Sequence, residues 1–338
     1  MSKAAELAAL IGSQSSLSNR NLIINGAMQV AQRGTSATAA GASGVYLIDR
    51  FEGFASGGGA YTMEQSTTVP NNTFKNSAKL VVTTADSSIA SSDYYAFNYN
   101  IEGQDIVPTG YGTSDAKSLS LSFQVRSSVT GTYSVTCYNH DGTRGYINTF
   151  TISSADTWTE VNLTWEGDTG GTWNKDNTKG MVIRFDLGGG SSGHGTANQW
   201  TTSGTFAANR TSGSVDWIAN SSATFYITGV QLEVGEQATP FEHRSFGDEL
   251  ARCQRYYEKS LVLHYYQLPT SSGAQVQRQH NRYQVQKRAA PTLTQTKDSG
   301  SAATTVGNVG GNLDGILHSF GGNDGEVIYF YWTADAEL

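Results

Sequence analysis

Apolar and polar side chains alternate in short runs through residues 21–243. In the clearest run, Leu119, Leu121, Phe123 and Val125 are separated by single polar residues, and the same period of two recurs at 133–137, 161–165 and 181–187. A period of two places the apolar side chains on one face of a strand. A sheet with one buried face and one solvent-exposed face is typical of antiparallel sheets. Turn-rich stretches separate the runs. The pattern therefore predicts a mainly β chain with an antiparallel sandwich of two sheets, a jelly roll, over 21–243.

The last of these strands changes phase. Phe225 and Ile227 point to one face, but the apolar alternation resumes at Val230, one residue later than a regular strand allows. An extra residue in one strand restores the inward direction of the side chains that follow it. We therefore expect a β-bulge at Thr228 and Gly229.

Two segments have a helical period. Residues 4–11 predict a helix of two turns, which is too short to be stable alone and must dock on another surface, so we interpret 1–20 as an attachment segment. A second helix is expected near 245–259, and its apolar stripe consists of Phe246, Leu250, Cys253 and Tyr257. Residues 261–338 return to β character. The helix and this tail form a small C-terminal β domain over 244–338, which would gain stability by packing against copies of itself.

Charge and composition restrict the classes of partner. The net charge of −7 argues against nucleic acid as the main partner, although residues 244–290 hold eight Arg or Lys against three Asp or Glu. This basic block is interpreted as a solvated strand face or subunit contact, with an acidic surface polymer as the alternative. No apolar run is long enough to span a membrane, and Glu6 interrupts the apolar stretch that a signal peptide would need. Cys137 and Cys253 lie in apolar patterns, so we expect two buried free thiols in a protein made in a reducing cytoplasm.

Catalytic motifs are weak. Residues 189–193 match G-x-S-x-G and 188–193 match G-x-G-x-x-G, but each motif needs a helix after the strand, and the sequence after 193 has no helical period. The six His residues are scattered without metal-binding spacing. Paired carboxylates that would cleave glycosidic bonds do not stand out among the many Asp and Glu residues. We expect a protein that is not an enzyme, with a polysaccharide depolymerase as the weaker alternative.

Aromatic side chains are the better candidates for a binding site. Tyr94 and Tyr95 begin a dense aromatic cluster, whereas Trp173 and Trp200 lie in polar, loop-like surroundings where exposure is expected. Sugar rings stack their C–H faces on such side chains, and neighbouring amides and carboxylates bind the hydroxyl groups. These four residues are the candidate glycan contacts. The alternative is that the cluster at 94–99 packs in the core or between subunits.

Several segments carry a resemblance to a known family. The ranges are 21–34 (NLIINGAMQVAQRG), 48–52 (IDRFE), 227–235 (ITGVQLEVG), 240–250 and 253–257. Together they resemble tail-fibre and virion proteins of phages, a group common among phages of marine bacteria and cyanobacteria. The resemblance frames about two-thirds of the chain.

The resemblance implies a jelly roll similar to carbohydrate-binding modules on a fibre that is usually trimeric. It also implies a structural calcium where the first and last strands meet, and the matching residues are Asn25 and Glu233, with Asp49 nearby. The expected function is that of a virion fibre protein, which attaches to other virion proteins through 1–20 and binds host surface polysaccharide. The alternative is a purely structural virion protein, such as a head decoration, head fibre or tail-collar component.

Overall fold

The computed structural model describes residues 19–41, 44–201, 209–260, 264–267, 275–299, 305–322 and 327–338, and the chain divides into two compact units, Met1–Ser245 and Phe246–Leu338. The predicted helix at 4–11 and nearly all of the predicted attachment segment 1–20 lie outside the described residues. No helix among the described residues is long and apolar enough to cross a membrane.

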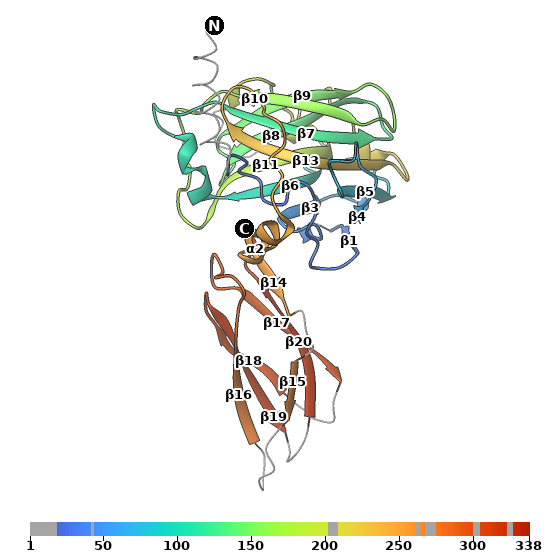
Figure 1. Ribbon diagram of the computed structural model, residues 1–338. Coiled ribbons are helices and arrows are strands. Elements are labelled where there is room, and N and C mark those ends of the chain that lie inside the picture. The colour runs from blue at the N-terminus through green and yellow to red at the C-terminus, as the bar shows by residue number, and fades with distance from the viewer. Residues whose placement is uncertain are drawn as a thin grey trace. The chain divides into compact units, whose positions relative to one another are not determined.

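The first unit is a sandwich of two antiparallel sheets (Figure 1). In spatial order, the six-stranded sheet contains β1 (Ser36–Ala39), β4 (Ala60–Ser66), β5 (Ser77–Thr84), β13 (Thr224–Val234), β7 (Leu119–Ser127) and β10 (Thr159–Trp165). The seven-stranded sheet contains β12 (Trp200–Thr201), β9 (Gly145–Ile152), β8 (Gly131–Asn139), β11 (Lys179–Gly189), β6 (Tyr94–Glu102), β3 (Phe51–Ala55) and β2 (Val45–Tyr46). The chain crosses between the sheets repeatedly, for example from β5 to β6 and from β7 to β8. The predicted antiparallel jelly-roll sandwich is confirmed.

Aromatic side chains fill the space between the two sheets. Phe123 of the six-stranded sheet meets Phe185 and Phe150 of the other sheet, with ring centroids 5.1 and 5.2 Å apart. Near one end, Tyr61 packs against Trp217 of the short helix η3 (Trp217–Ala219). Two further 3₁₀ helices, η1 (Gly103–Thr109) and η2 (Ser191–Gly193), lie in the connections. The alternating residues thus supply the core as expected, because their side chains leave each strand on the same face.

The predicted bulge is present in β13. Its register against β7 shifts between Thr228 and Gln231, and Gly229 has a φ of +64°. A left-handed backbone costs glycine little because it has no Cβ. The bulge returns Val230 and Leu232 to the core, where both are fully buried.

The expectation that each strand has one solvent-exposed face is wrong for three strands of the seven-stranded sheet. Nearly every residue of β6, β8 and β11 is buried. The connection 209–216 covers part of the outer face of β8 and β11, where Arg210 contacts Gly189 and Asp186. Ser134 Oγ lies 2.7 Å from Ser214 Oγ, and Thr136 donates a hydrogen bond of 2.7 Å to the carbonyl of Asn209. The period of two reports which side chains alternate, but it carries no information on what covers the polar side.

The second unit begins with α2 (Phe246–Gln254), which is shorter than the predicted helix over 245–259. Residues 257–259 instead form β14 (Tyr257–Lys259) and pair with β20 (Val327–Asp335). A local helical period cannot reveal this pairing, because the partner strand lies more than 70 residues away. Phe246, assigned to the buried stripe, is 55% exposed, whereas Cys253 is fully buried.

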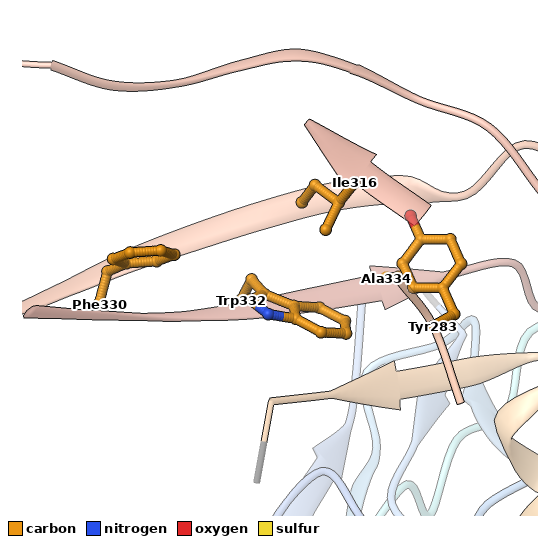
Figure 2. Packing of buried hydrophobic residues seen from close by; sticks show 5 residues of the cluster. All are labelled: Tyr283, Ile316, Phe330, Trp332 and Ala334. Atoms are coloured by element: carbon orange, nitrogen blue, oxygen red, sulfur yellow. The ribbon is translucent and has the colours of Figure 1, made fainter. Parts of the chain in front are cut away.

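Two small sheets complete this unit. Strand β20 pairs with β14, β15 (His264–Gln267) and β17 (Thr292–Ser299), while β16 (Gln275–Arg282), β19 (Gly315–Gly322) and β18 (Thr305–Gly311) form a three-stranded sheet. Figure 2 shows the buried cluster of this unit, which consists of Tyr283, Ile316, Phe330, Trp332 and Ala334. The basic block is partly structural, because Lys287 is buried and its Nζ lies 2.6 Å from Glu258 Oε2.

Candidate functional site: a planar ladder on the seven-stranded sheet

Four planar side chains stand side by side on the outer face of the seven-stranded sheet, one from each of the adjacent strands β8, β11, β6 and β3. The guanidinium carbon of Arg184 lies 4.9 Å from the ring centroid of Tyr138 and 4.7 Å from that of Tyr94. Tyr94 stacks on Phe54 with the centroids 4.6 Å apart and an interplanar angle of 6°. We call Tyr138, Arg184, Tyr94 and Phe54 the planar ladder. Stacking of this kind adds to the burial energy of the rings and holds each plane in place.

A row of hydrogen bonds runs beside the planar ladder. Arg184 Nε donates to Asn98 Oδ1 at 3.0 Å, and Asn98 Nδ2 donates to Glu52 Oε2 at 3.2 Å. Another guanidinium nitrogen donates to the hydroxyl of Tyr138 at 2.7 Å. Arg184 therefore belongs both to the stack and to the polar row, and neutral side chains of the sheet accept its hydrogen bonds.

One end of the planar ladder is accessible. Tyr138 and Arg184 are buried, whereas Phe54, Tyr94 and Glu52 are half-buried. A ligand that approaches this face would meet two aromatic side chains, one carboxylate and one phenolic hydroxyl. These groups can contact an apolar ring face and its attached hydroxyls at the same time.

The tyrosines of the planar ladder keep their protons at neutral pH. Burial raises the pKa of Tyr138 to about 12 and also raises the pKa of Tyr94, although Arg184 opposes the shift in each case. Both hydroxyls can therefore donate as well as accept hydrogen bonds. Burial lowers the pKa of the Lys179 ammonium at the start of β11, against the opposing influence of Glu52.

The structure separates the two tyrosines predicted to bind glycan. Tyr94 faces outward in the planar ladder, whereas Tyr95 faces the core and is 0% exposed. The Tyr95 hydroxyl donates to Asp86 at 2.6 Å and accepts from the amide of Gly59 at 2.9 Å. Successive residues of a strand point to opposite faces, so only Tyr94 can offer its side chain to a ligand on this face.

The expectation that Trp173 is exposed is wrong. Trp173 is 5% exposed, and its indole N–H donates to Asp168 Oδ2 at 3.0 Å. Asp168 is itself paired with Arg144, which fixes the preceding turn beside the indole ring. Trp200 is half-buried and packs edge-on against Trp173 and Tyr111, with centroids 5.8 and 5.7 Å away. The two tryptophans are thus brought together, with Trp200 on the edge strand β12 and Trp173 in the connection between β10 and β11, and neither belongs to the planar ladder.

Two of the residues predicted to bind calcium form a structural network. Asn25 Nδ2 donates to the carbonyls of Val30 and Asp49 at 2.9 and 3.0 Å, and Asn25 Oδ1 accepts from the Val30 amide at 2.9 Å. Both carboxylate oxygens of the fully buried Asp49 accept hydrogen bonds from Gln32. Oxygens that already face N–H donors are poorly arranged for a cation.

Glu233, the third residue of that prediction, is bonded elsewhere. Its carboxylate accepts from the amide and hydroxyl of Thr239 at 3.0 and 2.6 Å, and Arg20 Nε lies 3.0 Å from Oε1. A guanidinium therefore stands where a cation would need to approach. Within the described ranges, no group of three or more His, Cys, Asp or Glu residues could hold a metal ion. These residues as arranged do not fit calcium.

The Gly-rich motif matches lack their required context. Strand β11 ends at Gly189, and the next element is the three-residue η2, whose backbone leads into another loop. A nucleophile elbow and a phosphate-binding turn both need an α-helix at this point. The motifs at 188–193 thus form a loop beside the sheet.

Sequence reasoning missed three members of the planar ladder, namely Phe54, Tyr138 and Arg184. One signal was present, because Arg184 is the only positively charged residue in the apolar run from 181 to 187. Its neighbours Tyr94 and Tyr138 both lie more than 40 residues earlier in the sequence, on the strands β6 and β8 that flank β11 in the sheet. Only the strand order places the three together.

Comparisons with known proteins add a low-identity likeness to solved structures. No protein-family model and no curated protein matches the chain. The enzymatically active domain of tailspike protein 4 of bacteriophage CBA120 is 14% identical over 64% of this chain and 21% of that chain, with a TM-score of 0.32. A family 11 carbohydrate-binding module from Clostridium thermocellum is 11% identical over 61% of this chain and 98% of that chain, with a TM-score of 0.30. The N-terminal cellulose-binding domain of β-1,4-glucanase C from Cellulomonas fimi is 10% identical over 52% of this chain and 85% of that chain, with a TM-score of 0.29.

Proposed function

We propose that this chain is a fibre-type protein of a phage particle whose N-terminal sandwich binds a host surface glycan through the open end of the planar ladder. The observation that carries the binding role is the stack of Phe54 on Tyr94, half-buried beside the Glu52 carboxylate. Aromatic planes next to a hydrogen-bonding carboxylate suit a sugar ring, which is apolar on its faces and polar at its rim.

The assignment to a particle is supported by the sequence resemblance of the segments at 21–34, 48–52 and 227–257 to tail-fibre and virion proteins. In this proposal residues 1–20 attach the chain to other virion proteins. The second unit promotes assembly of three copies, and the chain is made in the host cytoplasm. In this proposal the sandwich binds a glycan and does not cleave it.

The binding role is tested with a matched pair of tyrosines. Tyr94 and Tyr226 are both half-buried on outer faces, and each lies beside an arginine, Arg184 at 4.7 Å and Arg126 at 5.1 Å from the ring centroid. We expect Tyr94→Ala to weaken binding to host envelope polysaccharide about tenfold, which corresponds to about 1.4 kcal/mol. Tyr226→Ala on the other sheet should leave the affinity unchanged.

The particle role is tested by adsorption competition. Purified protein is added to host cells at rising concentration before the phage, and unadsorbed phage are counted after a fixed time. We expect saturable blocking by the wild type and by Tyr226→Ala, with Tyr94→Ala blocking only at higher concentration. Absence of blocking by the folded wild-type oligomer would contradict receptor binding and favour a purely structural virion protein.

A further inference from the structure

A hollow of about 580 Å³ lies over the bulge of β13, on the outer face of the six-stranded sheet. Its floor consists of side chains from β7 and β10, and its wall consists of rings from the loop before β5 and from the segment after β13. We call it the bulge hollow. This volume is within the range of small-molecule sites in proteins.

The floor of the bulge hollow is a short hydrogen-bonded row. Gln124 Nε2 donates to Glu160 Oε2 at 3.2 Å, and Asn162 Nδ2 donates to Glu160 Oε1 at 3.3 Å. Glu160 and Asn162 are exposed and Gln124 is half-buried, so the remaining lone pairs and N–H groups face solvent. Amides and a carboxylate in one row can each bond a hydroxyl of the same ligand.

The wall is aromatic. Phe74 and Phe241 meet with ring centroids 5.2 Å apart, and His243 lies 4.9 Å from Phe241 and 5.5 Å from Phe74. Phe74 packs on the bulge itself, since a Cβ at Gly229 would lie 2.8 Å from its Cζ. Gly229 of the bulge therefore lines the bulge hollow and also contacts the Phe74 ring of its wall.

The charge of the lining restricts the ligand. The residues that line the bulge hollow include one carboxylate, that of Glu160, and one histidine, but neither lysine nor arginine. An acidic ligand would be repelled by Glu160 without a compensating cation. Rings beside amide and hydroxyl partners instead suit a neutral, hydroxyl-rich ligand with an apolar face.

We infer that the bulge hollow is a second saccharide site, which takes a neutral sugar unit on the sheet opposite to the planar ladder. This inference rests on the proposed glycan-binding function for its ligand class, but it uses a separate set of residues. Two sites on opposite faces of one sandwich would let a single copy engage two glycan chains, or two points on one chain.

The test measures stoichiometry with the full-length protein. A printed array of neutral gluco-, galacto- and manno-oligosaccharides identifies a ligand, and isothermal titration with that oligosaccharide gives the number of sites. The variants are Asn162→Ala and Glu160→Gln in the bulge hollow and Tyr94→Ala in the planar ladder. The control is Glu64→Gln, another strand carboxylate on the same sheet, which pairs with Lys79 at 3.0 Å. Urea unfolding midpoints confirm that each variant is folded.

We expect two sites per chain in the wild type and in Glu64→Gln. One site should weaken at least tenfold in Asn162→Ala and in Glu160→Gln, and the other in Tyr94→Ala. A single site that Tyr94→Ala abolishes and the bulge-hollow variants leave intact would overturn this inference while supporting the proposed function. A single site that only the bulge-hollow variants weaken would support the inference and contradict the planar ladder as a site. Absence of binding to every neutral oligosaccharide of the array would also overturn the inference.

Discussion

Gly229 is the position where one added methyl group should disturb the sandwich most specifically. With φ at +64°, Gly229→Ala places an L side chain in the left-handed region at a cost of about 1–2 kcal/mol. The new Cβ would also lie 2.8 Å from Cζ and 3.0 Å from Cε1 of the buried Phe74 ring. The Phe74 ring would have to move off its contacts with Phe241 and His243, which costs about 1–3 kcal/mol more. We therefore expect the free energy of unfolding to fall by about 2–5 kcal/mol.

Gly41→Ala is the matched control for this substitution. Gly41 has a similar φ of +69°, but a Cβ there would meet no atom of the described residues within 4 Å. Its loss should be limited to the backbone cost of about 1–2 kcal/mol. The difference between the two variants isolates the contact with Phe74 from the strain of the backbone.

Urea unfolding followed by tryptophan fluorescence provides the measurement. Trp332 is the only one of the six tryptophans in the second unit, so the signal reports mainly on the sandwich. A double-mutant cycle with Phe74→Ala completes the test, because removal of the ring should reduce the cost of Gly229→Ala by about 1–3 kcal/mol. Equal losses of unfolding free energy in Gly41→Ala and Gly229→Ala, or a coupling energy near zero, would refute the proposed clash between a side chain at position 229 and Phe74.

Three further outcomes are expected. Burial raises the pKa of Asp186 to about 7, so the folded state binds this proton more tightly than the unfolded state, and stability should fall as pH rises from about 4 to about 7. The urea midpoint of Asp186→Asn should decline less across this range than that of the wild type. The same dependence of the midpoint on pH in both proteins would count against Asp186 as its source. Lys287→Ala leaves the Glu258 carboxylate buried without its cation and should destabilise the second unit by about 3–5 kcal/mol. The double variant Lys287→Met with Glu258→Gln should regain much of this stability, as measured by thermal unfolding. Cys137 and Cys253 are buried free thiols, so a thiol reagent should label neither in the native protein and both in urea, and rapid labelling without urea would show local opening.

Local patterns in the sequence determined the sandwich. The alternation at 119–125 predicted β7, and the phase change after Ile227 predicted the bulge that the structure shows at Thr228 and Gly229. Both are properties of a few consecutive residues, since the direction of a side chain follows from its position along the strand. Burial of Cys137 and Cys253 followed in the same way from their apolar neighbours.

Tertiary structure alone decided which polar and aromatic residues lie together. Trp173 is buried because a paired Asp168 holds its indole, and α2 stops at Gln254 because the following residues pair with a strand from the end of the chain. The planar ladder likewise depends on strand order, and the bulge hollow depends on Phe74 meeting Phe241 across 167 positions of sequence. Such neighbours are set by long-range pairing, and a period of two or of 3.6 residues holds no information on the partner across the sheet.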